Sequence, residues 1–167
     1  MDETDAGWER RLAAAWAAID DYEPDAFVRL IDGLAAELPP TSAVARFERA
    51  GARDSTGHPD LAVPLYRAAL DSGLAAERRR RAVIQLASSL RNLGNPHEAL
   101  AMLAAELDGQ ADALTGAVRA FLALTLADAG REREGLAVAL TALSEYLPRY
   151  NRSVARYAQQ LTTDLDI

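Results

Sequence analysis

The stretch LASSLRNLGNPHEA, residues 86–99, holds the signals that decide the fold. Gly94 can take the left-handed backbone conformation that ends many helices. Directly after it, Asn95 suits an N-cap, Pro96 suits the first helical position, and Glu98 can complete a capping box. A helix stop followed at once by a helix start predicts two helices joined by a tight turn.

The turn glycine recurs along the chain at a regular interval, because Gly57, Gly94 and Gly130 are separated by 37 and 36 residues. Residues that follow a turn glycine by 5, 9 and 13 positions lie on one face of a helix, because these offsets advance by four. Five positions after each glycine the residue is small, as at Ala62, Ala99 and Gly135. Seven positions before it the residue is alanine, at Ala50, Ala87 and Ala123. Thirteen positions after it the residue is leucine, at Leu70, Leu107 and Leu143. The period predicts a tandem array of helix pairs whose small residues let the paired helices approach closely.

The same register continues toward the N-terminus. Thirty-six residues before Gly57 lies Asp21, with Ala14 seven positions before it and Leu34 thirteen positions after it. The first part of the chain therefore looks like a fourth, degenerate unit in which aspartate replaces the turn glycine.

These signals predict an all-α fold of antiparallel helix pairs with about nine helices. The expected helices lie near residues 7–21, 24–38, 42–56, 59–72, 76–93, 96–108, 112–129, 132–146 and 149–164. Gly73 and Gly109 are expected to end helices in the left-handed conformation. We expect a single array over residues 1–167, with a degenerate first pair at 7–38, repeats at 43–72, 76–108 and 112–146, and a C-terminal capping helix at 149–165 that is polar on one side.

Composition excludes several classes of protein. With 25 acidic and 18 basic residues the formal charge is -7, which disfavours binding to nucleic acid. The chain has no cysteine for disulfides, thiolate metal sites or thiol nucleophiles. No apolar window is long enough to span a membrane, and the acidic start Met1–Asp5 is unlike a signal peptide. We therefore expect a cytoplasmic protein without cofactors, metal or membrane association.

The repeated residues resemble the tetratricopeptide repeat family. The resemblance rests on Gly57, Ala62, Tyr66, Ala69 and Leu70 in one unit, on Ala87, Gly94, Ala99 and Leu107 in the next, and on Ala123, Gly130, Ala142 and Leu143 in the third. Residues 54–67 and 86–94 are similar to a bacterial subgroup of this family. The family's aromatic residue near the start of each first helix is replaced by Arg46, Val83 and Arg119, and the units are longer than its ~34-residue consensus.

The resemblance implies a right-handed α-solenoid whose first helices line a concave face and bind a peptide or protein partner. The candidate partner-binding residues are Asp54, Ser55, Arg81, Gln85, Ser88, Arg91, Asn92, Asp128 and Arg156. Arg81, Gln85, Ser88 and Asn92 form one helical stripe, and arginine can grip a carboxylate in two places. The carboxylate clamp of some family members is absent, because its positions correspond to Phe47, Gly51, Gln85, Ala117 and Phe121.

Other features favour a binding protein over an enzyme. His58 and His97 lie in turns beside prolines, and no phosphate loop, dinucleotide fingerprint or nucleophile elbow occurs. The run Arg78-Arg79-Arg80-Arg81 can capture phosphate or an acidic partner, although such runs are more often simply solvated.

Two tryptophans lie in the degenerate first unit. Core packing is expected for Trp16, whereas Trp8 can pack inward or support a homodimer. The leading hypothesis is a non-enzymatic module for a protein or peptide partner, and the alternative is a self-assembling unit that dimerises through the ends of the array.

Overall fold

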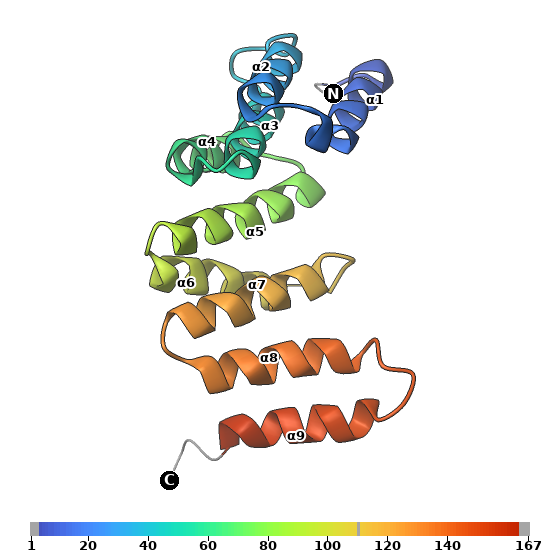
Figure 1. Cartoon of the computed structure of the whole chain (residues 1–167), viewed down its shortest axis with the longest axis vertical. Coiled ribbons are helices and arrows are strands. Elements are labelled where there is room, and N and C mark those ends of the chain that lie inside the picture. The colour runs from blue at the N-terminus through green and yellow to red at the C-terminus, as the bar shows by residue number, and fades with distance from the viewer. Residues whose placement is uncertain (1–3, 110, 164–167) are drawn as a thin grey trace. The chain divides into compact units, whose positions relative to one another are not determined.

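The computed structural model describes residues 4–109 and 111–163, and all regular structure in these ranges is helical. The chain divides into two compact units, Met1–Ser89 and Leu90–Ile167. Figure 1 shows the order of the helices, and neighbours along the chain, such as α3 and α4 or α7 and α8, pack side by side. The predicted all-α class of consecutive helix pairs is confirmed.

The expected helices are present with small shifts at their ends. The first unit contains α1 (Ala6–Ala17), a 3-10 turn (Ile19–Asp21), α2 (Pro24–Ala35), α3 (Ala43–Ser55), α4 (Pro59–Asp71) and most of α5 (Ala76–Asn92). The second unit contains the end of α5, α6 (Pro96–Leu107), α7 (Thr115–Asp128), α8 (Glu132–Ser144) and α9 (Asn151–Thr163). The predicted end of the last helix, beyond residue 163, lies outside the described residues.

The three turn glycines of the repeat adopt the same left-handed conformation. Their φ angles are 87° at Gly57, 79° at Gly94 and 75° at Gly130. At the first turn, the Gly57 N–H donates to the Asp54 carbonyl at 3.1 Å and the His58 N–H donates to the Arg53 carbonyl at 2.8 Å. The other two turns repeat this pair of bonds, which satisfies carbonyl groups that the end of a helix leaves without partners.

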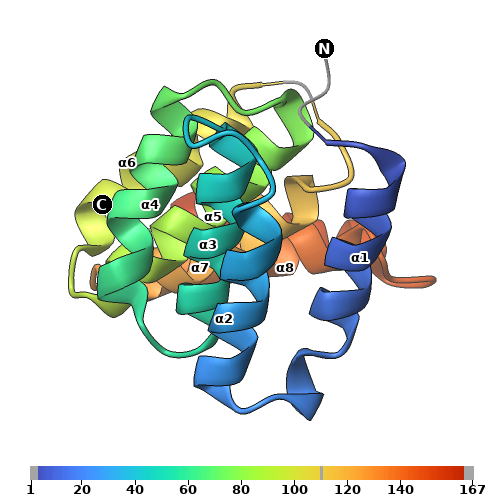
Figure 2. The same ribbon diagram turned by 90° about the horizontal axis from the view of Figure 1, so that it is seen from above.

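Asp21 does not form a turn of this kind. Helix α1 ends at Ala17 rather than near residue 21, and Ile19–Asp21 form a 3-10 turn instead. The physical reason is that a non-glycine residue pays a steric penalty in the left-handed conformation, so the chain turns without it. In Figure 2, α1 and α2 nevertheless run antiparallel, as a degenerate pair should.

Two other helix ends differ from expectation. Helix α7 begins at Thr115 rather than near 112, because the Asp112 side chain accepts a hydrogen bond from the Leu114 N–H at 2.8 Å and holds a turn. Gly73 ends α4 with a φ of 86°, as predicted, but the prediction for Gly109 was wrong, because its φ lies outside the left-handed region. Asn95 is the N-cap of α6, although its side chain makes no capping bond.

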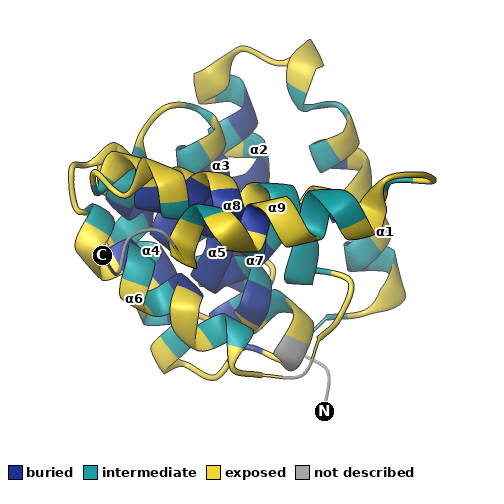
Figure 3. Cartoon of the chain, turned by 90° about the horizontal axis from the view of Figure 1, so that it is seen from below, coloured by how far each residue is buried: buried dark blue, intermediate teal, exposed yellow. Residues whose placement is uncertain are grey.

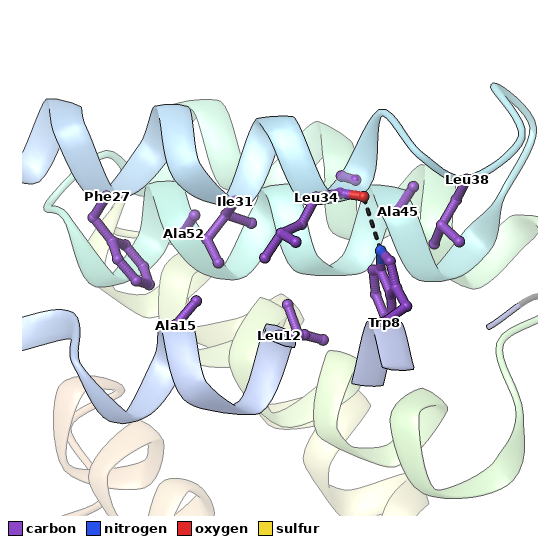
Figure 4. Close-up of a cluster of buried hydrophobic side chains, with 10 residues drawn as sticks. Trp8, Leu12, Ala15, Phe27, Ile31, Leu34, Leu38, Ala45 and Ala52 are labelled. Carbon is purple, nitrogen blue, oxygen red and sulfur yellow. Dashed lines mark hydrogen bonds between the residues drawn. The ribbon is translucent and has the colours of Figure 1, made fainter. Parts of the chain in front are cut away.

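The core of the first unit lies between α1, α2 and α3 (Figure 4). It is made of Trp8, Leu12, Ala15, Phe27, Ile31, Leu34, Ala35, Leu38, Ala45 and Ala52. Trp8 is 3% exposed, and its indole N–H donates to the Leu34 carbonyl at 2.9 Å. The expectation that Trp8 could be an exposed dimer contact is therefore wrong, because the tryptophan fills the space between α1 and α2.

The small residues of the repeat lie where helices meet. Ala50, Ala62, Ala87 and Ala99 are each fully buried. In the second unit, a Cβ placed on Gly135 would lie 2.6 Å from the Ala123 carbonyl oxygen, so α7 and α8 approach too closely for any side chain there. Figure 3 shows that α9, in contrast, carries many exposed residues, and its exposed positions include Arg156, Gln159, Gln160 and Thr163.

Candidate functional site

A cleft in the first unit is bordered by α1, α3 and α5. Its inner part has a volume of about 70 Å³ and is lined by Trp16, Phe47, Glu48, Gly51, Arg81 and Gln85. An adjoining space of about 330 Å³ shares Trp16, Glu48 and Arg81 and adds Glu9, Leu12, Ala13 and Arg78. We call the two spaces together the Arg81 cleft. Arg81 and Gln85, both predicted binding residues, are thus brought together with residues that sequence reasoning missed.

Glu48 is the buried acid of the Arg81 cleft, with 3% exposure. Its Oε2 accepts a hydrogen bond from the Trp16 indole N–H at 2.8 Å, and its Oε1 lies 3.6 Å from Nε of Arg78. Burial raises the pKa of the Glu48 carboxyl, and the indole donor and Arg78 only partly oppose this effect. Glu48 lies three residues after Ala45 and four before Ala52, both buried, and this placement on an apolar face was the signal available in the sequence.

The four consecutive arginines at the start of α5 have different surroundings. Arg78 pairs with Glu9 of α1 at 2.6 Å, and Arg80 is buried. Arg79 is exposed, whereas Arg81 is half-buried. The interpretation of this run as a simply solvated tract is therefore wrong for most of its members, because a helix distributes consecutive residues around its axis.

Arg81 lies over an aromatic ring. Its guanidinium carbon is 5.3 Å from the centroid of the Phe47 ring, a distance at which a cation is attracted to the ring face. Within residues 4–109 and 111–163, no hydrogen bond or ion pair engages this guanidinium. One helical turn further on, the Oε1 atom of Gln85 is buried and has no hydrogen-bond partner in the same ranges. The cleft therefore offers a donor group and an acceptor atom that are not already used.

Asp54 of α3 is engaged by neighbouring side chains. Its Oδ1 accepts a hydrogen bond from the Ser89 hydroxyl at 2.9 Å, and its Oδ2 lies 3.4 Å from the Tyr66 hydroxyl. Burial raises the pKa of the Asp54 carboxyl, and it also raises the pKa of Tyr66. Of the other predicted residues in this unit, Ser55 is exposed and Ser88 is half-buried.

The remaining predicted residues lie in the second unit and form no single cluster. Nε of Arg91 on α5 pairs with Oδ2 of Asp128 on α7 at 2.5 Å. Asn92 is exposed, and Arg156 lies over the ring of its neighbour Tyr157 at 5.1 Å. The structure thus brings Arg91 and Asp128 together, and the prediction that all nine residues line one face remains a prediction.

The second unit also contains an apolar groove that sequence reasoning missed. It has a volume of about 430 Å³ and is bordered by α6, α7, α8 and α9. Its apolar lining includes Leu100, Leu107, Leu122, Leu126, Val138 and Ala158. At its edge, Arg131 is paired with Glu134 at 2.6 Å. No period or motif distinguishes these leucines from core residues, because both follow the same helical spacing.

In the described part of the chain, no group of three or more histidine, aspartate or glutamate side chains is arranged to hold a metal ion. His58 and His97 are exposed. None of the described helices combines the length and apolar character needed to cross a membrane.

Comparison with known proteins identifies the repeat. A family model described as Tetratrico peptide repeat matches residues 43–161, which run from α3 to α9 and make up more than half of the chain. Neither the curated proteins nor the solved structures gave a significant match. The chain therefore belongs to the tetratricopeptide repeat family, and this membership suggests a module for protein–protein interaction.

Proposed function

We propose that the chain is a non-enzymatic interaction module that binds a peptide or protein partner through the face carrying the Arg81 cleft. The observation that carries this proposal is the half-buried Arg81 guanidinium, which lies over Phe47 and makes no hydrogen bond or ion pair with the described residues. A cation that is positioned but makes no direct ion pair is suited to receive a group from another molecule.

The surroundings of Arg81 suit a carboxylate or a carbonyl group of the partner. Stacking on Phe47 holds the planar guanidinium, so less side-chain freedom is lost when two parallel hydrogen bonds form. The neighbouring Arg78 is less available, because it pairs with Glu9 and lies near Glu48. The acceptor Oε1 of Gln85 can receive a donor, such as a backbone N–H of a bound segment.

The other predicted residues of the first unit have different roles in the proposed partner face. Asp54 of α3 accepts a hydrogen bond from Ser89 of α5 and so links the two helices. Ser55 and Ser88 offer hydroxyl groups to a partner. In the second unit, taken by itself, we propose Asn92, Arg156 and the Arg91–Asp128 pair as candidate partner contacts. Each of these contacts would contribute little to the binding free energy, because an exposed polar group exchanges a hydrogen bond to water for one to the partner.

The proposal is tested by affinity capture with the full chain, followed by quantitative mass spectrometry of the proteins retained. Arg81→Glu should reduce recovery of specific partners at least about tenfold, the loss expected when a buried charged hydrogen bond is broken. Arg79→Glu is the matched control, because it makes the same charge change two residues away on an exposed part of α5. Equal recovery by the wild type and Arg81→Glu would remove the Arg81 cleft as the partner site.

The alternative, a homodimer formed through the ends of the array, is favoured by three exposed tyrosines. Tyr146, Tyr150 and Tyr157 are 73%, 76% and 55% exposed, and tyrosine is enriched in protein interfaces. Light scattering on the full chain and on Tyr150→Ser decides this alternative. A monomeric wild type across working concentrations would rule it out, whereas a dimer that Tyr150→Ser weakens would support it.

A further inference from the structure

The last helix and the loop before it form a basic region of an acidic chain. Residues 146–163 contain no acidic residue and three arginines, Arg149, Arg152 and Arg156, whereas the whole chain has a formal charge of -7. All three arginines are exposed, and none forms an ion pair within the described residues 4–109 and 111–163. By contrast, Arg91 of the same unit pairs with Asp128 at 2.5 Å. The positive charge of this region is therefore available to another molecule.

Two exposed tyrosines accompany these arginines. Tyr150 directly follows Arg149, and Tyr157 directly follows Arg156. The guanidinium carbon of Arg156 lies 5.1 Å from the centroid of the Tyr157 ring, so the ring helps to position the cation. Tyrosine and arginine are enriched among the residues that dominate the binding energy of protein interfaces. We call Arg149, Tyr150, Arg152, Arg156 and Tyr157 the α9 face.

Local stability does not explain the residues of the α9 face. Tyr150 has a φ of 64°, a conformation that bulky side chains rarely adopt, and its exposure leaves this strain without compensation from burial. Arg152 lies in the first turn of α9, which contains no acid, and a positive charge there opposes the helix dipole. Exposed residues that cost the fold stability are candidates for a role in binding.

A segment of the first unit has the opposite charge. Residues 20–25 are all exposed and contain no base and four acids, Asp20, Asp21, Glu23 and Asp25. None of these carboxylates forms an ion pair in the described part of the chain. Ile19 packs against the core beside the segment, and the ring of Tyr22 lies 6.3 Å from that of Phe27. We call residues 20–25 the acidic segment, which is held on the core while its carboxylates stay unpaired.

The charged groups of the two surfaces have matching spacings. Arg152 and Arg156 are about one turn apart on α9, which is about 6 Å along the helix axis. Tyr22 has a φ of -115° and a ψ of 142°, so the chain between Asp21 and Glu23 is extended. Residues two apart in an extended chain lie on the same side, about 6.6 Å from each other. One pair of carboxylates therefore fits one pair of guanidinium groups.

We propose that the α9 face of one copy of the chain binds the acidic segment of a second copy. Arg152 and Arg156 pair with the carboxylates of the segment, and the exposed tyrosines pack beside these pairs. Because the two surfaces differ, the contact is head-to-tail, and each copy keeps one free surface for a further copy. The proposal gives a residue-level form to the self-assembly alternative and does not depend on the Arg81 cleft.

Charge favours a second copy over a nucleic acid as the occupant of the α9 face. The net charge of -7 repels a phosphate backbone, whereas a second copy brings an unpaired acidic segment at the same concentration as the face. Exposed ion pairs are individually weak and are screened by salt. The association is therefore expected to be weak and to depend strongly on ionic strength.

The experiment is sedimentation velocity on the full chain over a range of protein concentrations, at about 50 mM and about 500 mM salt. The wild type should self-associate at low salt and lose at least about tenfold in association constant at high salt. Arg152→Glu/Arg156→Glu and Asp21→Arg/Glu23→Arg should each weaken association at low salt at least about tenfold. Glutamate suits the first turn of α9 better than arginine does, so the first variant should not lose helix stability.

Mixing the two double variants supplies the matched control. The variant with the reversed α9 face keeps a normal acidic segment, and the other variant keeps a normal α9 face. The mixture should form a heterodimer that cannot grow further, and a chain carrying all four substitutions should regain self-association. The single variants Arg156→Glu and Glu23→Arg give the same test with smaller changes if a double variant does not fold.

Three results would overturn the proposal. A wild type that stays monomeric at low salt would leave the α9 face to an acidic segment of another protein. Self-association that persists in both double variants but is lost in Tyr150→Ser would indicate a contact between tyrosines instead. Double variants that do not associate when mixed would exclude a head-to-tail contact. None of these results affects the proposed function, which is tested separately by partner capture with Arg81→Glu.

Discussion

The Trp16 indole donates a hydrogen bond of 2.8 Å to Oε2 of Glu48, and this bond links α1 to the buried side of α3. The bond engages one oxygen of the buried Glu48 carboxylate. Nε of Arg78 lies 3.6 Å from the other oxygen, Oε1, and supplies the opposite charge. A carboxylate with this little exposure is costly to keep charged unless its oxygens are engaged.

Glu48 makes the stability of the chain depend on pH. Burial raises its pKa above the ordinary value of 4.5, so the folded chain holds this proton more tightly than the unfolded chain does. Its contribution to stability is therefore fully present below pH 4.5 and is lost as the pH rises through the raised pKa. Glu48→Gln removes the titration and keeps an oxygen acceptor for Trp16. In urea unfolding, the stability of the wild type relative to this variant should fall as the pH rises above 4.5.

Glu37 provides a control of opposite sign. Hydrogen bonding to Arg11 lowers the pKa of this exposed carboxyl, so its contribution to stability is present above pH 4.5 and is lost as the pH falls through the lowered pKa. The difference in stability between the wild type and Glu37→Gln should therefore change only as the pH falls below 4.5. A stability difference between the wild type and Glu48→Gln that stays constant from pH 4 to pH 8 would contradict the raised pKa of Glu48.

Gly135 is required by the close packing of α7 and α8. In Gly135→Ala the added methyl group would lie 2.6 Å from the Ala123 carbonyl oxygen, which is backbone and cannot move away cheaply. We expect a loss of about 1–3 kcal/mol of stability, measured by chemical unfolding, because the helices must separate. Gly33→Ala in α2 is the matched control: nothing lies within 4 Å of its added methyl group, so higher helix propensity should stabilise the chain by about 0.5–1 kcal/mol. Equal effects at the two positions would exclude a steric role for Gly135.

Gly94 is required for a different reason, its backbone conformation. The site has open space around the position of a Cβ, but its φ is 79°. Gly94→Ala should cost about 1–2 kcal/mol from left-handed strain alone, read from the shift in the urea midpoint. Gly94→Asn should cost less, because asparagine tolerates this conformation better. An alanine variant as stable as the wild type would mean that the turn can be rebuilt without the left-handed residue.

Arg53 and Asp32 join α3 to α2 through two parallel hydrogen bonds. Nη1 of Arg53 lies 3.0 Å from Oδ1 of Asp32, and Nη2 lies 2.9 Å from Oδ2. A double-mutant cycle of Arg53→Ala and Asp32→Ala should give a coupling energy of about 0.5–1 kcal/mol. Arg53→Lys should not preserve it, because lysine cannot form the two-pronged contact. A coupling retained by lysine would show that only the charge matters.

Much of the fold could be predicted from local chemistry. The positions of Gly57, Gly94 and Gly130 predicted the three turns, because a left-handed helix stop is a property of one residue and its immediate neighbours. The small residue at Gly135 predicted a close approach of helices, because each helix face repeats with a known period. Where the turn glycine was missing, at Asp21, the predicted end of the first helix was wrong, because α1 ends at Ala17 and a 3-10 turn follows.

The candidate site was predictable only in part. Arg81 and Gln85 were identified because they share a stripe of α5, which is again a local property. Trp16 and Glu48 were missed as members of the site, since they are 32 residues apart and meet only when α1 folds back onto α3. Trp8, which the sequence left open between core packing and a dimer contact, is enclosed in the core, whereas Trp16, expected in the core, packs against it and is half-buried at the cleft.

The amino-acid sequence by itself determined the helices, their turns and the period that makes them a repeat, because these depend on residues close together in the chain. Only the tertiary structure decided which charges are neutralised: Arg78 meets Glu9 across 69 positions of sequence, while Arg81, three residues later, lies over Phe47 without an ion pair in the described part of the chain. The physical reason is that a charge responds to what surrounds it in space, and that environment exists only after distant helices have packed.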